Sequence, residues 1–482
     1  MKLFEDPKID RRFNRMQWRM LFATMIGYTL FYFMRKNFSF AMPGLQQDCG
    51  ISKSMLGNFL FWGGIVYGLS KFLNGVIGDR MNPKRMFCFG LLVCTLVNVA
   101  FGFAPQLAAI FTGGGDPSMT ALAWTFGILL VVNQFFQGTG FPPCAKLIAF
   151  WVPPNELATK MSVWNTSHSI GGGLVAKICG VIMGLGVIGA ANQGVGMWRW
   201  CFWAMAVLGG LGLLLMLVWL PGTPKDEGLP DLPGTEGGEE GRGKREEGRG
   251  KREEGREKRE EGKGKREEER GECESSTLDP QRASAIRMVF LNPVIWMLGF
   301  INITINAVRA LVADWGPTML QESKGFTPSE SGTVIMLFEF AGIVGMLFAG
   351  WATDRLCGGR APRLCVFLML LTAALFAAFW FLPSGIIGAA ALCLGGFCIY
   401  GPQALTGVTA TNLSTKRFAG TSIGFISLFS YIGVSIAGKV FGNLAQSSGG
   451  WALPLMVTAS TAFVGAGLFL CLWRTRANSY EG

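Results

Sequence analysis

The chain of 482 residues lacks several features that mark soluble enzymes and disulfide-rich proteins. It contains one histidine, and none of its twelve cysteines has the spacing of a metal site. Only Cys49 is expected to face the oxidising side of a membrane, where it has no disulfide partner. No Gly-x-x-x-x-Gly-Lys-Ser/Thr loop is present, which argues against nucleotide hydrolysis. We therefore expect no metal, no cofactor and no enzymatic activity.

The N-terminus also lacks the pattern of a cleavable signal peptide. The stretch from Met1 to Gln17 is long and charged, and the first apolar stretch carries Arg35 without a small-residue cleavage site. We expect this segment to remain in the mature protein.

Long apolar runs are what the sequence has in abundance. Half of the residues are hydrophobic, and apolar stretches of about 20 residues, the length that crosses a bilayer as a helix, recur along the chain. The 67 glycines suit close packing of membrane helices. These features predict an all-α membrane protein of twelve transmembrane helices. The expected spans are 18–42, 55–77, 86–106, 120–142, 159–187, 197–220, 290–316, 331–352, 363–383, 385–410, 418–443 and 451–473.

The placement of positive charge predicts the topology. The formal net charge is +11, and the basic excess falls in short loops that a twelve-span count puts on one side. By the positive-inside rule that side is the cytoplasm, so both termini are expected there in a cell inner membrane. This distribution argues against a nucleic-acid partner. The loop clusters are Arg11, Arg12 and Arg15; Arg80, Lys84 and Arg85; Arg355, Arg360 and Arg363; Lys416 and Arg417; and Arg474 and Arg476.

A charged, low-complexity segment separates six spans from six. We expect an N-terminal half at 1–220, a cytoplasmic linker at 221–286 and a C-terminal half at 287–482. The linker repeats a seven-residue Arg/Glu/Gly/Lys unit from Arg245 to Lys265 and has no apolar positions that could form a coiled-coil seam. A mostly disordered, solvated linker is predicted, with a docking tract for an acidic lipid or a protein as the alternative.

The two halves resemble each other in register. Arg35 precedes Pro43 by eight residues, and Arg309 precedes Pro317 by eight. The distance from each arginine to an Asp-Arg pair beyond the next span is 44 residues in the first half and 45 in the second. This repetition predicts two six-helix halves related by a pseudo-twofold axis.

The loops that contain these Asp-Arg pairs resemble the major facilitator signature G-x-x-x-D-R/K-x-G-x-R/K-R/K. They lie in Gly75 to Arg85 and in Gly350 to Arg360. The resemblance implies the major facilitator fold, with these loops as a conformational latch that opens during alternating access. An ordinary positive-inside loop is the alternative. The implied latch residues are Asp79, Arg80, Asp354 and Arg355.

Ionisable side chains inside the spans predict an anion site. A charge in the bilayer is costly and is retained where it faces the bundle interior and has a partner. The candidates are Arg35, Lys71, His168, Arg309, Glu339 and Lys439, and they leave the interior cationic. Because a guanidinium group is planar and binds phosphate oxygens with two hydrogen bonds, Arg35 and Arg309 form a suitable clamp for a phosphate group.

Helical spacing places polar and aromatic residues on the faces of these charges. Tyr28 and Tyr32 precede Arg35 by seven and three residues, and Tyr67 precedes Lys71 by four. Asn165 precedes His168 by three. Aromatic packing between helices is an equal alternative for each tyrosine, and a hydrogen-bonded packing role is the alternative for the histidine.

The chain resembles the organophosphate:phosphate antiporter family over nearly its whole length outside the linker. The resemblance rests on Phe31 to Phe38 with Ala41 to Pro43, Tyr67 to Phe72, Phe136 to Cys144, Trp164 to Gly173, Arg309 with Asp314 and Trp315, and Phe338 to Ile343. It implies that Arg35 and Arg309 hold the substrate phosphate and that Lys71 and His168 add positive field. The residues that it implies to line the pore are Tyr28, Tyr32, Tyr67, Asn165, Glu339, Tyr400 and Tyr431.

The resemblance also implies a reaction: exchange of an organophosphate for inorganic phosphate by rocking of the two halves, in a monomer. Glycerol 3-phosphate is favoured, because Ile423 to Ile426 is uncharged where the hexose-phosphate carriers have an aspartate and a lysine. A hexose-6-phosphate antiporter and a sugar-phosphate sensor acting on a histidine kinase are the alternatives. Asn306, in place of a tyrosine, and Lys439 depart from the glycerol-3-phosphate pattern.

Overall fold

A computed structural model describes residues 4, 6–113, 117–188, 196–232, 290–413 and 419–475, and its regular structure there is helical. The N-terminal helices are α1 (Pro7–Cys49), α2 (Lys53–Arg80), α3 (Pro83–Gly102), α4 (Ala104–Phe111), α5 (Met119–Gln137), α6 (Phe141–Trp151), α7 (Pro154–Ile188) and α8 (Trp198–Trp219). The C-terminal helices are α11 (Pro293–Lys324), α12 (Pro328–Leu356), α13 (Ala361–Phe381), α14 (Ile386–Leu413), α15 (Ala419–Ser447) and α16 (Ala452–Cys471).

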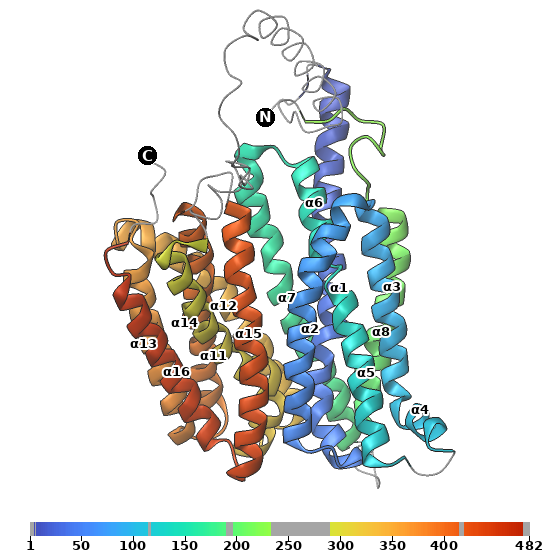
Figure 1. The fold of residues 1–482 in the computed structure, drawn as a ribbon, viewed down its shortest axis with the longest axis vertical. Helices are drawn as coiled ribbons and strands as arrows, with labels where there is room; N and C mark the ends of the chain where they lie inside the picture. The colour runs from blue at the N-terminus through green and yellow to red at the C-terminus, as the bar shows by residue number, and fades with distance from the viewer. Residues whose placement is uncertain are drawn as a thin grey trace, which may run out of the picture.

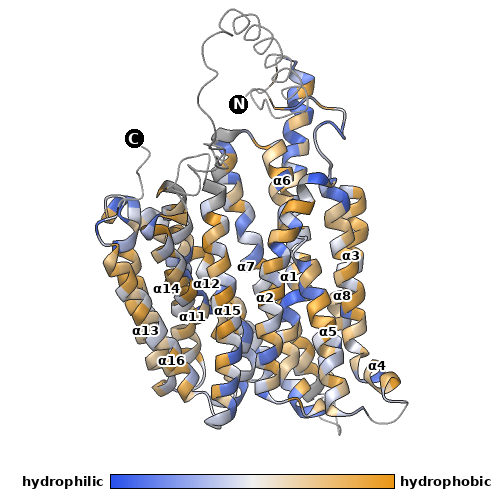
Figure 2. Cartoon of the chain, viewed as in Figure 1, coloured by the Kyte–Doolittle hydropathy of each residue, from blue (hydrophilic) through white to orange (hydrophobic). Residues whose placement is uncertain are grey.

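The all-α membrane class is confirmed. Eleven helical segments in the described ranges are long and apolar enough to cross a bilayer, with α5 and α6 counted as one segment, Met119–Trp151. Helix α1 brings the number to the twelve expected. It is 43 residues long and is buried along α7 and α8, although Arg35 and Lys36 lower its mean hydropathy. Apolar residues cover the outer faces of the bundle in Figure 2.

The expected span at 120–142 lies within the segment Met119–Trp151 but stops short of its end. Helix α5 ends at Gln137, and α6 restarts at Phe141, Pro142 and Pro143 and continues to Trp151. Proline is favoured in the first turn of a helix, where its missing N–H group needs no partner. The two prolines therefore start a new helix rather than ending the span.

Helix α1 begins earlier than its apolar stretch. The Asp6 side chain accepts a hydrogen bond from the Lys8 backbone N–H, and Pro7 occupies the first turn. Phe13 is fully buried, with its ring centre 5.0 Å from that of Trp151 on α6. The first turns of α1 thus form a packed extension beyond the apolar part of the bundle (Figure 2).

The first residues of the linker expected at 221–286 are ordered and pack on the N-terminal half. The Trp151 indole N–H donates to the Gly222 carbonyl at 2.8 Å, and Arg12 donates to the Glu227 carbonyl at 3.0 Å. Leu229 and Leu232 are buried. Apolar anchors therefore fix the first residues of this segment to the N-terminal half. The repeats of the linker lie outside the described residues, and its disorder there stays a prediction.

Two groups of helices meet along seams. Helices α1 to α8 pack mainly on one another, as do α11 to α16, and α2 meets α15 while α7 meets α12. These contacts define the α2–α15 seam and the α7–α12 seam, and α1 also contacts α11. We call the end of the bundle where α1 begins and α16 ends the terminal face, at the top of Figure 1, and the other end the opposite face.

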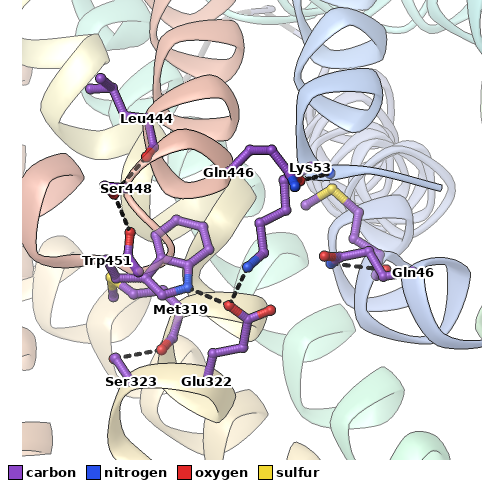
Figure 3. Close-up of polar contacts among 11 residues, drawn as sticks. Gln46, Lys53, Met319, Glu322, Ser323, Leu444, Gln446, Ser448 and Trp451 are labelled. Atoms are coloured by element: carbon purple, nitrogen blue, oxygen red, sulfur yellow. Dashed lines mark hydrogen bonds and ion pairs between the residues drawn. The ribbon is translucent and has the colours of Figure 1, made fainter. Parts of the chain in front are cut away.

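The seams are closed toward the opposite face. Lys53 at the start of α2 pairs with Glu322 of α11 at 2.6 Å, and the indole N–H of Trp451 donates to the same carboxylate oxygen at 2.8 Å (Figure 3). The Ser54 hydroxyl donates to Asn443 of α15 at 2.7 Å. We refer to Lys53, Glu322 and Trp451 as the clasp.

Candidate functional site

Arg35 and Arg309 lie in the middle of α1 and α11, one in each group of helices. Only 14% of the Arg309 side chain is exposed. The Nε atom of each arginine is buried and has no hydrogen-bond partner within the described part of the chain. A guanidinium group keeps its charge when buried, so each arginine presents an unsatisfied donor that an anion can fill.

Aromatic rings hold both guanidinium groups in place. The Arg35 guanidinium carbon lies 4.0 Å from the ring centre of Tyr32 and 4.7 Å from that of Tyr67. The Arg309 guanidinium carbon lies 4.6 Å from the ring centre of Tyr400. Cation–π contact orients a guanidinium group without occupying its hydrogen-bond donors. The predicted aromatic neighbours therefore lie beside the predicted clamp.

The two arginines differ in their counter-charge. Arg309 lies 3.5 Å from a carboxylate oxygen of Glu339, which is 3% exposed and accepts a hydrogen bond from the Tyr400 hydroxyl. Arg35 has no ion pair among the described residues. An incoming anion therefore competes with Glu339 for Arg309 and meets no such competitor at Arg35.

Lys71 and Tyr431 join the two halves beside Arg35. The Lys71 ammonium donates to the Tyr431 hydroxyl at 2.9 Å and lies 4.3 Å from the ring centre of Phe141. The Tyr431 ring centre is 5.0 Å from that of Tyr67. Phe141 was not among the predicted residues, although it opens the helix that follows the Gly138 to Gly140 turn.

His168 lies against the same aromatic cluster. Its Nδ1 is hydrogen-bonded to the carbonyl oxygen of Asn165. Because a carbonyl only accepts, Nδ1 carries the proton and Nε2 of the neutral ring keeps its lone pair. The His168 ring centre is 6.0 Å from that of Tyr32, and the Tyr28 ring centre is 4.8 Å from that of Trp164, with the two rings tilted by 36°. The hydrogen bond expected for a packing histidine is therefore present, and the pore-lining role stays a prediction. The Asn165 side chain is exposed.

An ion pair that was not predicted links the halves beside the clamp. Lys36 of α1 pairs with Asp314 of α11, whose side chain is 6% exposed. Lys36 directly follows Arg35, and Asp314 lies five residues after Arg309. Their opposite signs and intramembrane positions are the signal that could have identified them.

Other predicted residues lie away from this cluster. Lys439 is exposed on α15, with its ammonium 5.2 Å from the ring centre of Phe61. Asn306 is buried and donates to the Asn302 carbonyl one turn earlier at 2.9 Å. Arg80, Asp354 and Arg355 are exposed, the side chain of Asp79 is not described, and the latch stays a prediction.

The assembled site is cationic. Arg35, Lys71 and Arg309 face one carboxylate, Glu339, while Lys36 and Asp314 cancel. His168 lies within electrostatic reach of both arginines. In the described ranges no group of three metal-binding side chains occurs. The chemistry that this charge favours is binding of an anion with several acceptor oxygens.

Comparisons with known proteins agree with this arrangement. A sequence model of the Major Facilitator Superfamily matches residues 24–438. The chain is 32% identical to a glycerol-3-phosphate transporter of Bacillus subtilis, over 91% of this chain and 87% of that protein. It is 31% identical to a probable hexose phosphate transport protein of Chlamydia trachomatis, over 99% and 96%. A membrane sensor protein of Escherichia coli is 31% identical, over 89% and 86%.

The fold has solved counterparts. A crystal structure of a bacterial homologue of the human lysosomal transporter Spinster, inward-facing and unoccupied, superposes with a TM-score of 0.69 over 97% of this chain and 99% of that one. At 14% identity this likeness concerns the fold alone. The chain therefore belongs to the major facilitator superfamily, as a transporter of the organophosphate:phosphate antiporter family.

Proposed function

We propose that this protein exchanges glycerol 3-phosphate for inorganic phosphate, with Arg35 and Arg309 binding the phosphate group of either substrate. The observation that carries this proposal is the partnerless Nε of both arginines among the described residues, on corresponding helices of the two halves. Charge-assisted, two-point hydrogen bonding is the interaction that phosphate oxygens offer to such a pair. Lys71 adds a third positive charge, which favours a dianionic ligand.

The stretch Ile423 to Ile426 supports glycerol 3-phosphate over a hexose phosphate. Its aromatic member, Phe425, packs 5.1 Å from the ring of Trp296 and 5.2 Å from that of Phe290. Ile426 offers only its carbonyl oxygen, which accepts a hydrogen bond from Asn302 at 3.5 Å. Residues that pack between helices therefore stand where the hexose-phosphate carriers have charged side chains. The relative from Bacillus subtilis is named for the same substrate.

Exchange would proceed by alternating access. On the α2–α15 seam the contacts run from Lys71 and Tyr431 at the site to Ser54 and Asn443 near the opposite face. On the α7–α12 seam they run from Gly172 and Glu339 to Gly184 and Ser329. Both seams are thus closed between the site and the opposite face. We assign this arrangement to the inward-facing state, with both termini in the cytoplasm and the chain in the inner membrane.

A membrane-bound sensor of sugar phosphates is the second candidate, favoured by the similarity to the Escherichia coli sensor. The same clamp would then bind ligand without completing the cycle. The two functions differ in turnover rather than in the binding site.

Proteoliposomes loaded with inorganic phosphate test the proposal. Labelled glycerol 3-phosphate should enter these vesicles and should not enter vesicles without internal phosphate. Unlabelled glucose 6-phosphate should compete poorly. Saturable binding to the purified protein without phosphate-dependent uptake would contradict the transporter and support the sensor, and preferred uptake of glucose 6-phosphate would contradict the assigned substrate.

A further inference from the structure

The two seams contain glycines that bring their helices into backbone contact. A Cβ atom added to Gly332 of α12 would lie 2.3 Å from the Ala176 carbonyl oxygen and 3.0 Å from the Gly180 Cα. A Cβ atom added to Gly57 of α2 would lie 3.1 Å from the Gly438 carbonyl oxygen. Gly442 of α15 lies against Gly57 in the same way, at 3.2 Å.

The same pattern occurs on both seams. One reads Ala176-Lys177-Ile178-Cys179-Gly180, and the other reads Gly438-Lys439-Val440-Phe441-Gly442. The facing glycine is the fifth residue after the helix cap in each case, Gly332 after Thr327 and Gly57 after Ser52. The last glycine of each pattern meets the first residue of the facing helix, Pro328 or Lys53. Lys177 and Lys439 are therefore equivalent residues of the two halves.

Both lysines lie on the rim of their seam that faces lipid. Leu174 and Val181, one turn to either side of Lys177, are exposed apolar residues. Ile436 and Val440 beside Lys439 are exposed as well. Because apolar side chains on the outside of a membrane bundle contact hydrocarbon, these lysines lie among lipid chains and outside the substrate site.

Neither lysine has a counter-charge in the described part of the chain. The Lys177 ammonium donates to the Thr333 hydroxyl across the seam at 2.8 Å, and the Lys439 ammonium lies over the ring of Phe61 across the other seam. A hydroxyl or a ring cannot neutralise an ammonium group. An unpaired cation at this position is costly, so it must be hydrated or find an anion.

The depth of the two lysines in the bilayer indicates which anion they can reach. Lys177 precedes the end of its apolar span at Leu185 by eight residues, and Lys439 precedes the end of its span at Ser447 by eight, a rise of about 12 Å in each case. Their Cα atoms thus lie within one leaflet, roughly 15 Å thick in its hydrocarbon part. Long lysine stems extend toward the headgroup level from such positions. The anion present there is the phosphodiester of a phospholipid.

We propose that Lys177 and Lys439 each bind the phosphate of one phospholipid in the leaflet at the opposite face, one lipid on each seam. Each lysine contacts the facing half, through Thr333 or Phe61, so a bound headgroup lies over the line where the halves part. Lipid binding therefore favours the closed seam, and it is independent of which organophosphate the central site accepts.

Native mass spectrometry of the full-length protein with added phosphatidylglycerol tests this inference. The variants Lys177→Gln and Lys439→Gln should each retain one lipid fewer than the wild type, and the double variant two fewer. Lys177→Arg should retain the wild-type number, because arginine keeps the charge. Lys225→Gln, in the segment beyond α8, serves as the control and should not change the number.

Two further arms identify the ligand. Diacylglycerol, which lacks phosphate, should not be retained, and inorganic phosphate in millimolar excess should not displace the lipid. Equal lipid numbers in the wild type and the double variant would overturn the proposal. So would displacement by inorganic phosphate, which would mark a site for the free ion, and so would loss of lipid in Lys177→Arg.

Discussion

At the scale of single residues, the site depends on hydrogen-bond donors that neighbouring rings orient and that have no acceptor in the described part of the chain. The rings of Tyr32, Tyr67 and Tyr400 orient the guanidinium groups from one side, and the buried Nε atoms have no acceptor among the described residues. Glu339 pairs with Arg309 and accepts a hydrogen bond from the Tyr400 hydroxyl. The ring of Tyr400 also contacts the Arg309 guanidinium group. Under the proposed function, substrate binding would exchange one 3.5 Å ion pair for contacts with phosphate oxygens.

Replacing either clamp arginine by lysine should abolish exchange. Arg35→Lys and Arg309→Lys keep the charge and lose the planar fork, which removes charge-assisted hydrogen bonds worth about 1.5–3 kcal/mol each, or roughly a tenfold to hundredfold loss of affinity. Phosphate-driven uptake into proteoliposomes measures the effect. Arg15→Lys, at an exposed position near the start of the same helix as Arg35, is the matched control. Wild-type rates in either clamp variant would refute the assignment.

Neutralising Glu339 should separate binding from turnover. Glu339→Gln keeps the shape and removes the charge that competes for Arg309, so substrate should bind several-fold more tightly while exchange slows, because phosphate leaves a more cationic site less readily. Calorimetric titration and uptake rates measure the two effects. Tyr400→Phe, which removes only the hydroxyl bound to Glu339, should change both much less. Weaker binding in Glu339→Gln would contradict competition.

At the scale of helices, glycines set how closely the halves approach. Helix α12 contacts α7 through Gly332, where even a methyl group has no room. A methyl group added to Gly350 on the same helix would instead enter open space, with no described atom within 4 Å. Backbone approach of the kind seen at Gly332 is the usual role of small residues between membrane helices. The α7–α12 seam can therefore close fully only with glycine at 332.

Gly332→Ala should hold the α7–α12 seam open at the opposite face. The added methyl would lie 2.3 Å from the Ala176 carbonyl oxygen, a backbone atom that cannot move without displacing α7. Hydrogen–deuterium exchange of peptides covering 173–184 and 328–336 should rise. The affinity for substrate that enters from the terminal face should fall, because the inward-facing state is less populated. Gly467→Ala on α16, where the added methyl group would have no described atom within 4 Å, should leave hydrogen–deuterium exchange of these peptides at the wild-type level. Unchanged protection in Gly332→Ala would show that the seam is looser than its geometry indicates.

At the scale of the whole molecule, the clasp joins the halves where substrate would enter from the opposite face. Glu322 is held within the C-terminal half by the indole of Trp451, so only its bond to Lys53 must break when the halves part. The Lys53 backbone N–H also donates to Gln446 of α15 at 3.1 Å. The start of α2 is thus capped by the other half, as Figure 3 shows.

Charge reversal at the clasp should shift the molecule toward the outward-facing state. Lys53→Glu places two carboxylates together and should open the α2–α15 seam several-fold more often, because a partly exposed ion pair is worth about 0.2–1 kcal/mol and repulsion reverses its sign. Hydrogen–deuterium exchange at 53–60 and 439–447 measures the opening. The double variant Lys53→Glu with Glu322→Lys should restore protection. Unchanged hydrogen–deuterium exchange in Lys53→Glu would contradict a contribution of this ion pair to seam closure.

Sequence patterns alone located most of the helices and the clamp. Apolar runs of bilayer length are a local property, so the spans were predictable, and the matching offsets from Arg35 and Arg309 marked equivalent positions before any contact was known. The continuation of the fourth span as α6 is a local feature, because Pro142 and Pro143 favour the start of a helix, and the expected span stopped short of it. The folded start of the linker was not predictable in this way, because it depends on the contact of Trp151 with Gly222, which local composition does not record.

The sequence by itself determined the membrane class, the two arginines and their aromatic neighbours, because charge cost in a bilayer and helical period act within one segment. Only the tertiary structure decided which charges meet. It paired Lys36 with Asp314, placed Glu339 against Arg309, and brought Lys439 and Lys177 to Phe61 and Thr333 of the facing half. Those pairings depend on how the two halves pack across their seams, and no single helix carries that information.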